Sequence, residues 1–151
     1  MNNTLRYILL KPLSMLYGIG VDIRNKLFDL GIYHSKKSKI STISIGNITV
    51  GGTGKTPHAE YLLSLLSNKI NTAYLSRGYK RSTSGYRLAD DRSNASTIGD
   101  EAYQIKLKYP NVMVAVDGNR HNALKKLNNS KTPPKVVVLD DAYQHRSLHP
   151  D

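Results

Sequence analysis

The amino-acid sequence predicts an α/β domain in which helices flank a mostly parallel sheet. Short apolar runs, of the length of buried strands, alternate along the chain with segments of helical periodicity. A glycine-rich turn, residues 51–54, joins the first of these runs to a helical segment. The last run, residues 135–139, is continuously apolar and ends in two aspartates. Such a run is typical of a strand that is covered on both faces.

The composition fits one globular domain with an anionic partner. The chain has 151 residues, of which 39% are hydrophobic, and its mean hydropathy of −0.43 is that of a soluble chain. It has no cysteine, which excludes disulfides and thiolate metal sites. No apolar run approaches the roughly 20 residues that span a bilayer. The net charge of +11 suggests a nucleotide, a nucleic acid or an anionic membrane surface as partner.

The N-terminal segment, residues 1–36, is predicted to be an amphipathic helix. Apolar residues from Leu5 to Leu30 recur at helical spacing and form one stripe, and Pro12 is expected to break or restart the helix near its position. Basic residues outnumber acidic ones in this segment, as in helices that lie on anionic membranes. Packing of the stripe against the domain core is an equally open alternative.

The stretch from Ile43 to Pro57, ISIGNITVGGTGKTP, predicts a phosphate-binding loop between a strand and a helix. Glycines allow backbone N–H groups to face phosphate oxygens, and the helix N-terminus adds its positive dipole end. Lys55 would reach the β- and γ-phosphates, and the Thr56 hydroxyl would bind Mg²⁺. The fold class is therefore P-loop NTPase-like, and the predicted nucleotide-binding residues are Gly51, Gly52, Thr53, Gly54, Lys55 and Thr56.

This loop departs from the strict phosphate-loop pattern at one position. Thr49 stands where the pattern has its first glycine. A glycine-rich turn that merely caps a helix is the alternative, but the strand before the turn and the helix after it favour phosphate binding. Val50 stands where partition-type ATPases carry a second lysine, which argues against that subtype.

The remaining elements alternate between helix and strand, as a parallel sheet with crossover helices requires. We expect a helix over 57–67, a strand over 71–76, a polar loop or hairpin over 82–98, a helix over 99–109, a strand over 111–116, a helix that ends near 128 and the last strand over 135–139.

Charged residues follow the predicted strands, at the edge where open α/β sheets bind ligands. The basic run from Arg77 to Arg81 suits a phosphate or an anionic substrate, with a solvated charge run as the alternative. Asp100 and Glu101 open a helix, where acidic residues are also common dipole partners. Asp140 and Asp141 end the last strand and are predicted to hold Mg²⁺, directly or through water, opposite the loop threonine.

The chain resembles the tetraacyldisaccharide 4′-kinase family in five motifs, GNITVGGTGKTP, LSRGYKR, GDE, DGNR and DDAYQHR. Their order and spacing are more specific than any one of them. The resemblance implies an enzyme that transfers the γ-phosphate of ATP, with Mg²⁺, to the 4′-hydroxyl of a tetraacyldisaccharide 1-phosphate lipid A precursor. It also implies a peripheral position on the cytoplasmic face of the bacterial inner membrane, with its anionic surface as partner of the N-terminal segment.

The resemblance also assigns roles to residues. Lys55 and Asp100 match catalytic positions, and the Asp100 carboxylate is expected to help activate the sugar hydroxyl. Thr56, Asp140 and Asp141 match the metal side of the site. The further site candidates are Arg77, Glu101, Arg120, Gln144 and His145. Ala102 and Ala142 are mild departures from the family pattern.

A larger departure concerns the C-terminal side. The family continues into a smaller domain that closes the active site and supplies a histidine partner for the catalytic aspartate. Residues 37–151 are therefore expected to be a kinase core that is truncated at its C-terminus and inactive alone. His145 matches a different motif and does not take that histidine's role.

Two other classes of function stay open at this point. A switch or transport NTPase on the same fold would consume ATP without a sugar-lipid acceptor. A non-enzymatic nucleic-acid binder would explain the positive charge, but the sequence has no helix-turn-helix or aromatic platform signature. Nucleic acid is therefore not expected as a partner, and the oligomeric state is not predicted.

Overall fold

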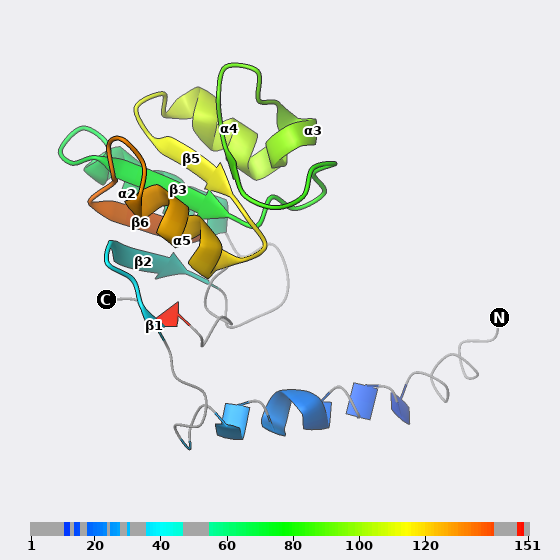
Figure 1. Cartoon of the computed structure of the whole chain (residues 1–151). Coiled ribbons are helices and arrows are strands. Elements are labelled where there is room, and N and C mark those ends of the chain that lie inside the picture. The colour runs from blue at the N-terminus through cyan, green and yellow to red at the C-terminus, as the bar shows by residue number, and fades with distance from the viewer. Residues whose placement is uncertain are drawn as a thin grey trace. The chain divides into compact units, whose positions relative to one another are not determined.

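The computed structural model of this chain describes residues 11–12, 14–15, 18–23, 25–27, 30, 36–46, 55–140 and 148–149. The chain divides into two compact units, residues 1–35 and residues 36–151 (Figure 1). The second unit contains the main sheet and is described first.

Five strands form the main sheet in the order β2-β6-β3-β5-β4 (Figure 1). Their bounds are β2 Ser41–Ile45, β6 Val136–Asp140, β3 Thr72–Ser76, β5 Met113–Val116 and β4 Arg87–Leu88. The first four strands in this order run parallel, and only the short edge strand β4 pairs antiparallel, with β5. A separate pair is formed by β1, Lys36–Lys37, and β7, Leu148–His149. The mostly parallel sheet is the one that the sequence predicts.

Helices cover both faces of the main sheet (Figure 1). The helices are α2 Lys55–Leu66, α3 Ala95–Ile98, α4 Asp100–Lys108 and α5 Arg120–Asn128. Side chains of α2, α3 and α4 join one buried cluster, and side chains of α5 join a second cluster on the opposite face. The crossover connections of a parallel sheet require this arrangement.

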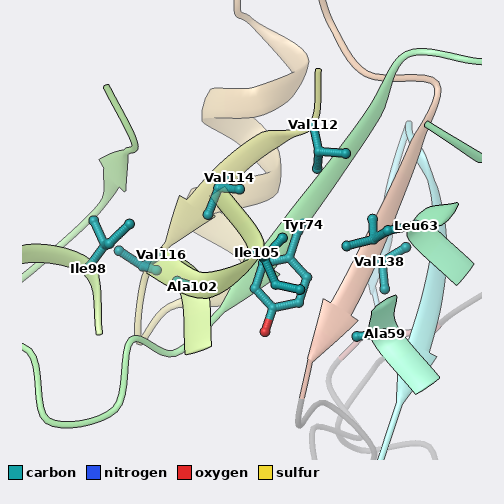
Figure 2. Close-up of a cluster of buried hydrophobic side chains, with 10 residues drawn as sticks. All are labelled: Ala59, Leu63, Tyr74, Ile98, Ala102, Ile105, Val112, Val114, Val116 and Val138. Carbon is teal, nitrogen blue, oxygen red and sulfur yellow. The ribbon is translucent and has the colours of Figure 1, made fainter. Parts of the chain in front are cut away.

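The two central strands supply side chains to both clusters, because successive residues of a strand point to opposite faces. Tyr74 and Val138 lie in the cluster with α2 and α4 (Figure 2). Leu75 and Leu139 lie in the cluster with α5. Every residue of β3 and of β6 is buried. This explains why the sequence of β6 is a continuous apolar run rather than an alternation.

The segment predicted as a polar loop or hairpin, residues 82–98, is loop over 82–86 and 89–94, but it also contains the short edge strand β4 and the unpredicted helix α3. The helix begins because Asn94 caps it: the Thr97 N–H donates to Asn94 Oδ1 over 3.1 Å, and the Asn94 N–H donates to Thr97 Oγ1 over 2.9 Å. A threonine at the third helical position in place of the usual Glu or Gln hides this reciprocal cap in the sequence.

The first unit is helical at residues 11–12, 14–15, 18–23 and 25–27, and its remaining described residue, Leu30, lies in a turn. Pro12 has helical backbone, and residues 1–10 and 13 lie outside the described residues, so the break or restart of the helix near Pro12 stays a prediction. Of the predicted apolar stripe, Ile19, Ile23 and Leu30 are exposed. Within the described part of the chain, no helix is long and apolar enough to cross a bilayer.

We expect Leu63→Ala to lower the free energy of unfolding by about 3 kcal/mol, because the Leu63 side chain is fully buried between α2 and the sheet. Leu65→Ala is the matched control on the same helix. Leu65 is 45% exposed, so its loss should cost less than about 1 kcal/mol. Urea unfolding of both variants measures the difference, and equal losses would contradict the described packing of α2.

Candidate functional site

The carboxyl ends of β2 and β6 lie side by side at one edge of the sheet. The two strands are parallel, and Ile45 pairs with Asp140 in their register. The chain therefore leaves β2 beside Asp140 and reaches the start of α2 at Lys55. The predicted loop residues Gly51, Gly52, Thr53 and Gly54 lie outside the described residues, as does the side chain of Lys55, so their roles stay predictions.

Asp140 is the best-defined candidate on the nucleotide side. Its side chain is on the face that α2 and α4 cover, and the residue is only 3% exposed. The Tyr74 hydroxyl donates to Asp140 Oδ2 over 2.6 Å. Asp140 Oδ1 is buried and accepts no hydrogen bond from any residue that the structure describes. Because a buried carboxylate oxygen is costly without a partner, and because Mg²⁺ prefers oxygen ligands, this oxygen fits the predicted metal role.

Tyr74 is a member of the site that sequence reasoning missed. Burial, followed by the nearby carboxylates of Asp140 and Glu101, raises the pKa of its hydroxyl. The hydroxyl therefore keeps its proton at neutral pH and is the donor in the bond to Asp140. No signal in the sequence marks this contact, because the two residues are 66 positions apart and meet only through the register of β3 and β6.

Arg120, a predicted site candidate, lies buried behind this edge with 3% exposure. Its Nη1 donates to the Asp117 carbonyl over 2.5 Å, and its Nη2 donates to the Asp140 carbonyl over 3.0 Å. These bonds join the backbone at the ends of β5 and β6. The structure thus gives Arg120 a role in holding the two strand ends in place.

The loop that carries Arg120 is itself fixed by Asp117, which is buried directly after β5. Asp117 Oδ1 accepts from the Asn119 N–H over 2.9 Å, and Oδ2 accepts from Asn122 Nδ2 over 2.7 Å. Asn119 in turn caps α5 by accepting from the Asn122 N–H over 3.1 Å. The DGNR motif therefore forms a turn that starts α5 and places Arg120 against the ends of β5 and β6.

A second part of the site is a cavity of about 220 Å³ at the start of α4. Its lining residues come from the end of β3, from the loop after it and from the first turn of α4, and they are Ser76, Gly78, Tyr79, Lys80, Gly99, Asp100, Glu101 and Ala102. Asp100 and Glu101 are exposed there. The cavity combines accessible carboxylates with the Lys80 ammonium, which suits a polar substrate that carries hydroxyl and anionic groups.

Two glycines bring the walls of this cavity together. Gly99 precedes α4 with φ +89° and ψ 155°, and a Cβ at this position would lie 2.9 Å from the Tyr79 carbonyl oxygen. Gly78 has φ +69°, and a Cβ there would lie 2.6 Å from Arg81 Cδ. The loop after β3 and the turn before α4 therefore approach each other closely, which places Tyr79 and Lys80 beside Asp100.

The basic run after β3 does not present three equivalent cations. Arg81 Nη2 donates to the Gly85 carbonyl over 2.6 Å, so this guanidinium helps to fold its own loop. Arg77 and Lys80 are exposed and face solvent as the sequence suggests. Arg81 is therefore a structural residue of its own loop, and the roles of Arg77 and Lys80 toward an anionic ligand stay predictions.

The structure thus gathers the described candidates into two groups. Asp140 lies with Tyr74 and Arg120 at the edge of the sheet, and Asp100 lies with Tyr79 and Lys80 at the start of α4. Glu101 is near both groups, since it lines the cavity and its charge acts on the Tyr74 hydroxyl. The predicted candidates Asp141, Gln144 and His145 lie outside the described residues.

Comparisons with known proteins identify the family that this chain resembles. A family model described as tetraacyldisaccharide-1-P 4′-kinase matches residues 6–151. The tetraacyldisaccharide 4′-kinase of Flavobacterium johnsoniae is 53% identical over 146 residues, which are 97% of this chain and 43% of that protein. The enzyme of the same name from Parabacteroides distasonis is 51% identical, over 94% of this chain and 39% of its own length. This chain therefore spans about two fifths of the length of these relatives.

Among solved structures, the crystal structure of the "apo" form of LpxK from Aquifex aeolicus in complex with ATP resembles this chain with a TM-score of 0.83 and 36% sequence identity. The match covers 93% of this chain and 45% of that one. It confirms the predicted fold class, a P-loop NTPase-like α/β domain with a mostly parallel sheet.

We expect Gly99→Ala to lower the free energy of unfolding by about 3 kcal/mol, because an alanine would be strained at this φ and would also collide with the Tyr79 carbonyl. Gly85→Ala is the matched control, since Gly85 has φ +69° but open space around its Cα. Strain alone should cost that variant about 1 kcal/mol. Chemical unfolding compares the two, and equal losses would show that the close approach of the loops does not matter.

Proposed function

This chain belongs to the tetraacyldisaccharide-1-P 4′-kinase family, and on this premise we propose that it binds ATP with Mg²⁺ and serves phosphoryl transfer to a lipid A precursor. The acceptor would be the 4′-hydroxyl of a tetraacyldisaccharide 1-phosphate. The observation that carries the proposal is the buried Asp140 carboxylate beside the end of β2, whose Oδ1 has no hydrogen-bond partner among the described residues.

On the nucleotide side, Asp140 would hold Mg²⁺ together with Thr56 and Asp141. The chemistry that Mg²⁺ would supply there is positive charge that stabilises the phosphate groups. The start of α2 would place Lys55 and the first helical N–H groups toward the phosphates. The Tyr74 and Arg120 bonds hold Asp140 in place before any ligand arrives, so little reorganisation is needed on binding.

On the acceptor side, Asp100 is the proposed base or hydrogen-bond acceptor for the sugar hydroxyl. Its carboxylate is exposed at the cavity at the start of α4, where a hydroxyl can reach it. Lys80 and Arg77 supply exposed positive charge near the same loop, which would attract a phosphorylated disaccharide. Phosphoryl transfer requires mainly that the two substrates be positioned and their charge stabilised, and these residues supply both effects.

The proposal is tested by Lys55→Ala and Asp100→Ala in the intact protein that contains this sequence. Lys55→Ala should lower turnover by at least about 100-fold, as the loss of a key electrostatic group does. Asp100→Ala should lower turnover while the affinity for Mg–ATP stays within a few-fold. Lys69→Ala removes an exposed lysine beyond α2 and should change neither quantity.

The assay measures transfer of labelled γ-phosphate to the disaccharide in detergent micelles, together with ATP affinity. Near-normal transfer by Lys55→Ala would contradict the phosphate-loop assignment. ATP consumption that is equal with and without the disaccharide would instead favour a switch or transport NTPase.

We further propose a peripheral position on the anionic, cytoplasmic face of the inner membrane through residues 1–36. Three observations support it. Residues 11–12, 14–15, 18–23 and 25–27 are helical, the large apolar side chains of Met15, Ile19, Ile23 and Leu30 are exposed, and basic residues outnumber acidic ones along the segment. Exposed apolar side chains on a basic helix favour insertion at the boundary between headgroups and acyl chains.

Deletion of residues 1–31 should weaken cosedimentation with vesicles that contain anionic lipid, because each basic residue near the surface contributes about 1 kcal/mol of attraction. The double variant Ile19→Gln and Ile23→Gln should weaken binding without a change in charge. Vesicles of neutral lipid alone are the control for the electrostatic part. Unchanged binding of both variants would show that the stripe packs within the protein.

A further inference from the structure

We propose that Tyr74 is a positioning residue, whose hydroxyl holds Asp140 by Oδ2 and so keeps Oδ1 directed to the Mg²⁺ of the nucleotide. This inference rests on the proposed function, because it assigns a role toward the metal of that site. It concerns a residue that none of the five sequence motifs includes, since Tyr74 lies within β3, before the LSRGYKR loop begins to turn.

The sheet register explains why a tyrosine can do this. Tyr74 pairs with Val138 across the parallel strands β3 and β6. Asp140 lies two residues further along β6, on the same face, at a distance of roughly 7 Å along the strand. A serine or threonine at position 74 would be too short to reach it, and a large apolar side chain would have no proton to donate. The tyrosine spans the gap and donates over 2.6 Å.

Packing fixes the donor. The Tyr74 ring is fully buried and lies among Leu63 of α2, Ile105 of α4 and Val138 of β6, with its hydroxyl oxygen at the border of the cluster (Figure 2). Because a close-packed core leaves a ring little room to move, the position of the hydroxyl is set before ligand binding. The aromatic core thereby determines the direction of a carboxylate at the sheet edge.

The backbone of Asp140 is fixed as well. Arg120 Nη2 donates to its carbonyl oxygen over 3.0 Å from the other side of the strand end. With the carbonyl held, the freedom that is left to the carboxylate is rotation about the two side-chain bonds of Asp140, and the Tyr74 bond to Oδ2 restricts both rotations.

A simple core hydrogen bond does not account for this pair. If the Asp140 carboxylate served only to accept the bond from Tyr74, its second oxygen would be expected to have a donor of its own. Oδ1 is instead buried and has no donor among the described residues. This arrangement, with Oδ2 bound by a protein donor and Oδ1 left for a cation, is the one expected of a metal ligand that a neighbouring side chain orients. Residues in such supporting positions typically change metal affinity 10- to 100-fold when they are replaced.

The test is Tyr74→Phe in this 151-residue chain, which removes one oxygen atom and keeps the ring. ATP binding is measured by titration calorimetry at a series of Mg²⁺ concentrations and in EDTA. We expect the Mg²⁺ concentration for half-maximal enhancement of ATP binding to rise about tenfold. ATP affinity in EDTA should not change, because the substitution leaves the phosphate loop intact.

Tyr109→Phe is the matched control. The Tyr109 hydroxyl donates to the Glu60 carbonyl over 2.9 Å, between α4 and α2 and away from Asp140. This variant loses a comparable hydrogen bond, so it should lose stability to urea without any shift in the Mg²⁺ requirement. A purely structural role of Tyr74 would give the same result for Tyr74→Phe.

A double-variant experiment tests whether Tyr74 affects the Mg²⁺ requirement through Asp140. Asp140→Asn should raise the Mg²⁺ requirement by itself, and adding Tyr74→Phe to it should cause little further change, because the two residues act through one interaction. If the increase in the Mg²⁺ requirement of the double variant instead equals the product of the two single-variant increases, the two residues act independently and the proposal is wrong.

The outcomes distinguish this inference from the function on which it rests. A parent chain that binds no ATP at any Mg²⁺ concentration would contradict the proposed function of this chain, and the role of Tyr74 would be lost with it. A parent chain that binds ATP in a Mg²⁺-dependent way, with Tyr74→Phe indistinguishable from it, would leave the function standing and overturn only the role of Tyr74.

Discussion

The hydrogen bond between Tyr74 and Asp140 connects the core of this protein to its candidate site. One partner is an aromatic ring in the cluster between the sheet, α2 and α4, and the other is a carboxylate at the edge where β2 and β6 end. Because burial disfavours the charged form of a carboxylate, Asp140 can remain there only with donors or a cation to compensate. The Tyr74 hydroxyl supplies one donor to Oδ2, and Oδ1 has no donor among the described residues, which is where the proposed Mg²⁺ would compensate.

Much of the fold could be predicted from the sequence, because strands covered on both faces have continuous apolar runs and because glycines mark the sharp turns. The segments Val136–Asp140 and Thr72–Ser76 are recognisable for this reason. The short helix α3, between β4 and α4, was not predicted. Its start depends on the side-chain cap of Asn94, which hydrophobic periodicity does not reveal. Strand bounds shifted by one or two residues, as local signals fix ends poorly.

The types of residue in the candidate site could be predicted from the sequence, but the role of each residue could not. Arg81 and Arg120 look alike in the sequence, as basic residues in loops that follow strands. In the structure Arg81 binds a carbonyl of its own loop, and Arg120 binds two carbonyls from beneath the sheet edge. A guanidinium with several donors is equally suited to a phosphate and to backbone carbonyls, so only the three-dimensional neighbourhood decides between these uses. The same holds for Tyr74, whose partner is set by strand register rather than by sequence spacing.

The two parts of the site differ in a way that matches their proposed tasks. Around Asp140 the side chains are buried and hydrogen-bonded, so the core would set the geometry that the proposed metal meets. Around Asp100 the carboxylates are exposed, and the shape of the cavity depends on the backbone contact of Gly99 with the loop after β3. A triphosphate with its metal presents the same oxygens in every turnover, and a rigid, preorganised cradle stabilises them best. The proposed acceptor, a large amphiphile, would have to enter and leave, which an exposed cavity between two loops allows. The rigid part of the site, around Asp140, therefore lies in the sheet. The accessible part, around Asp100, lies on turns whose backbone conformation requires glycine.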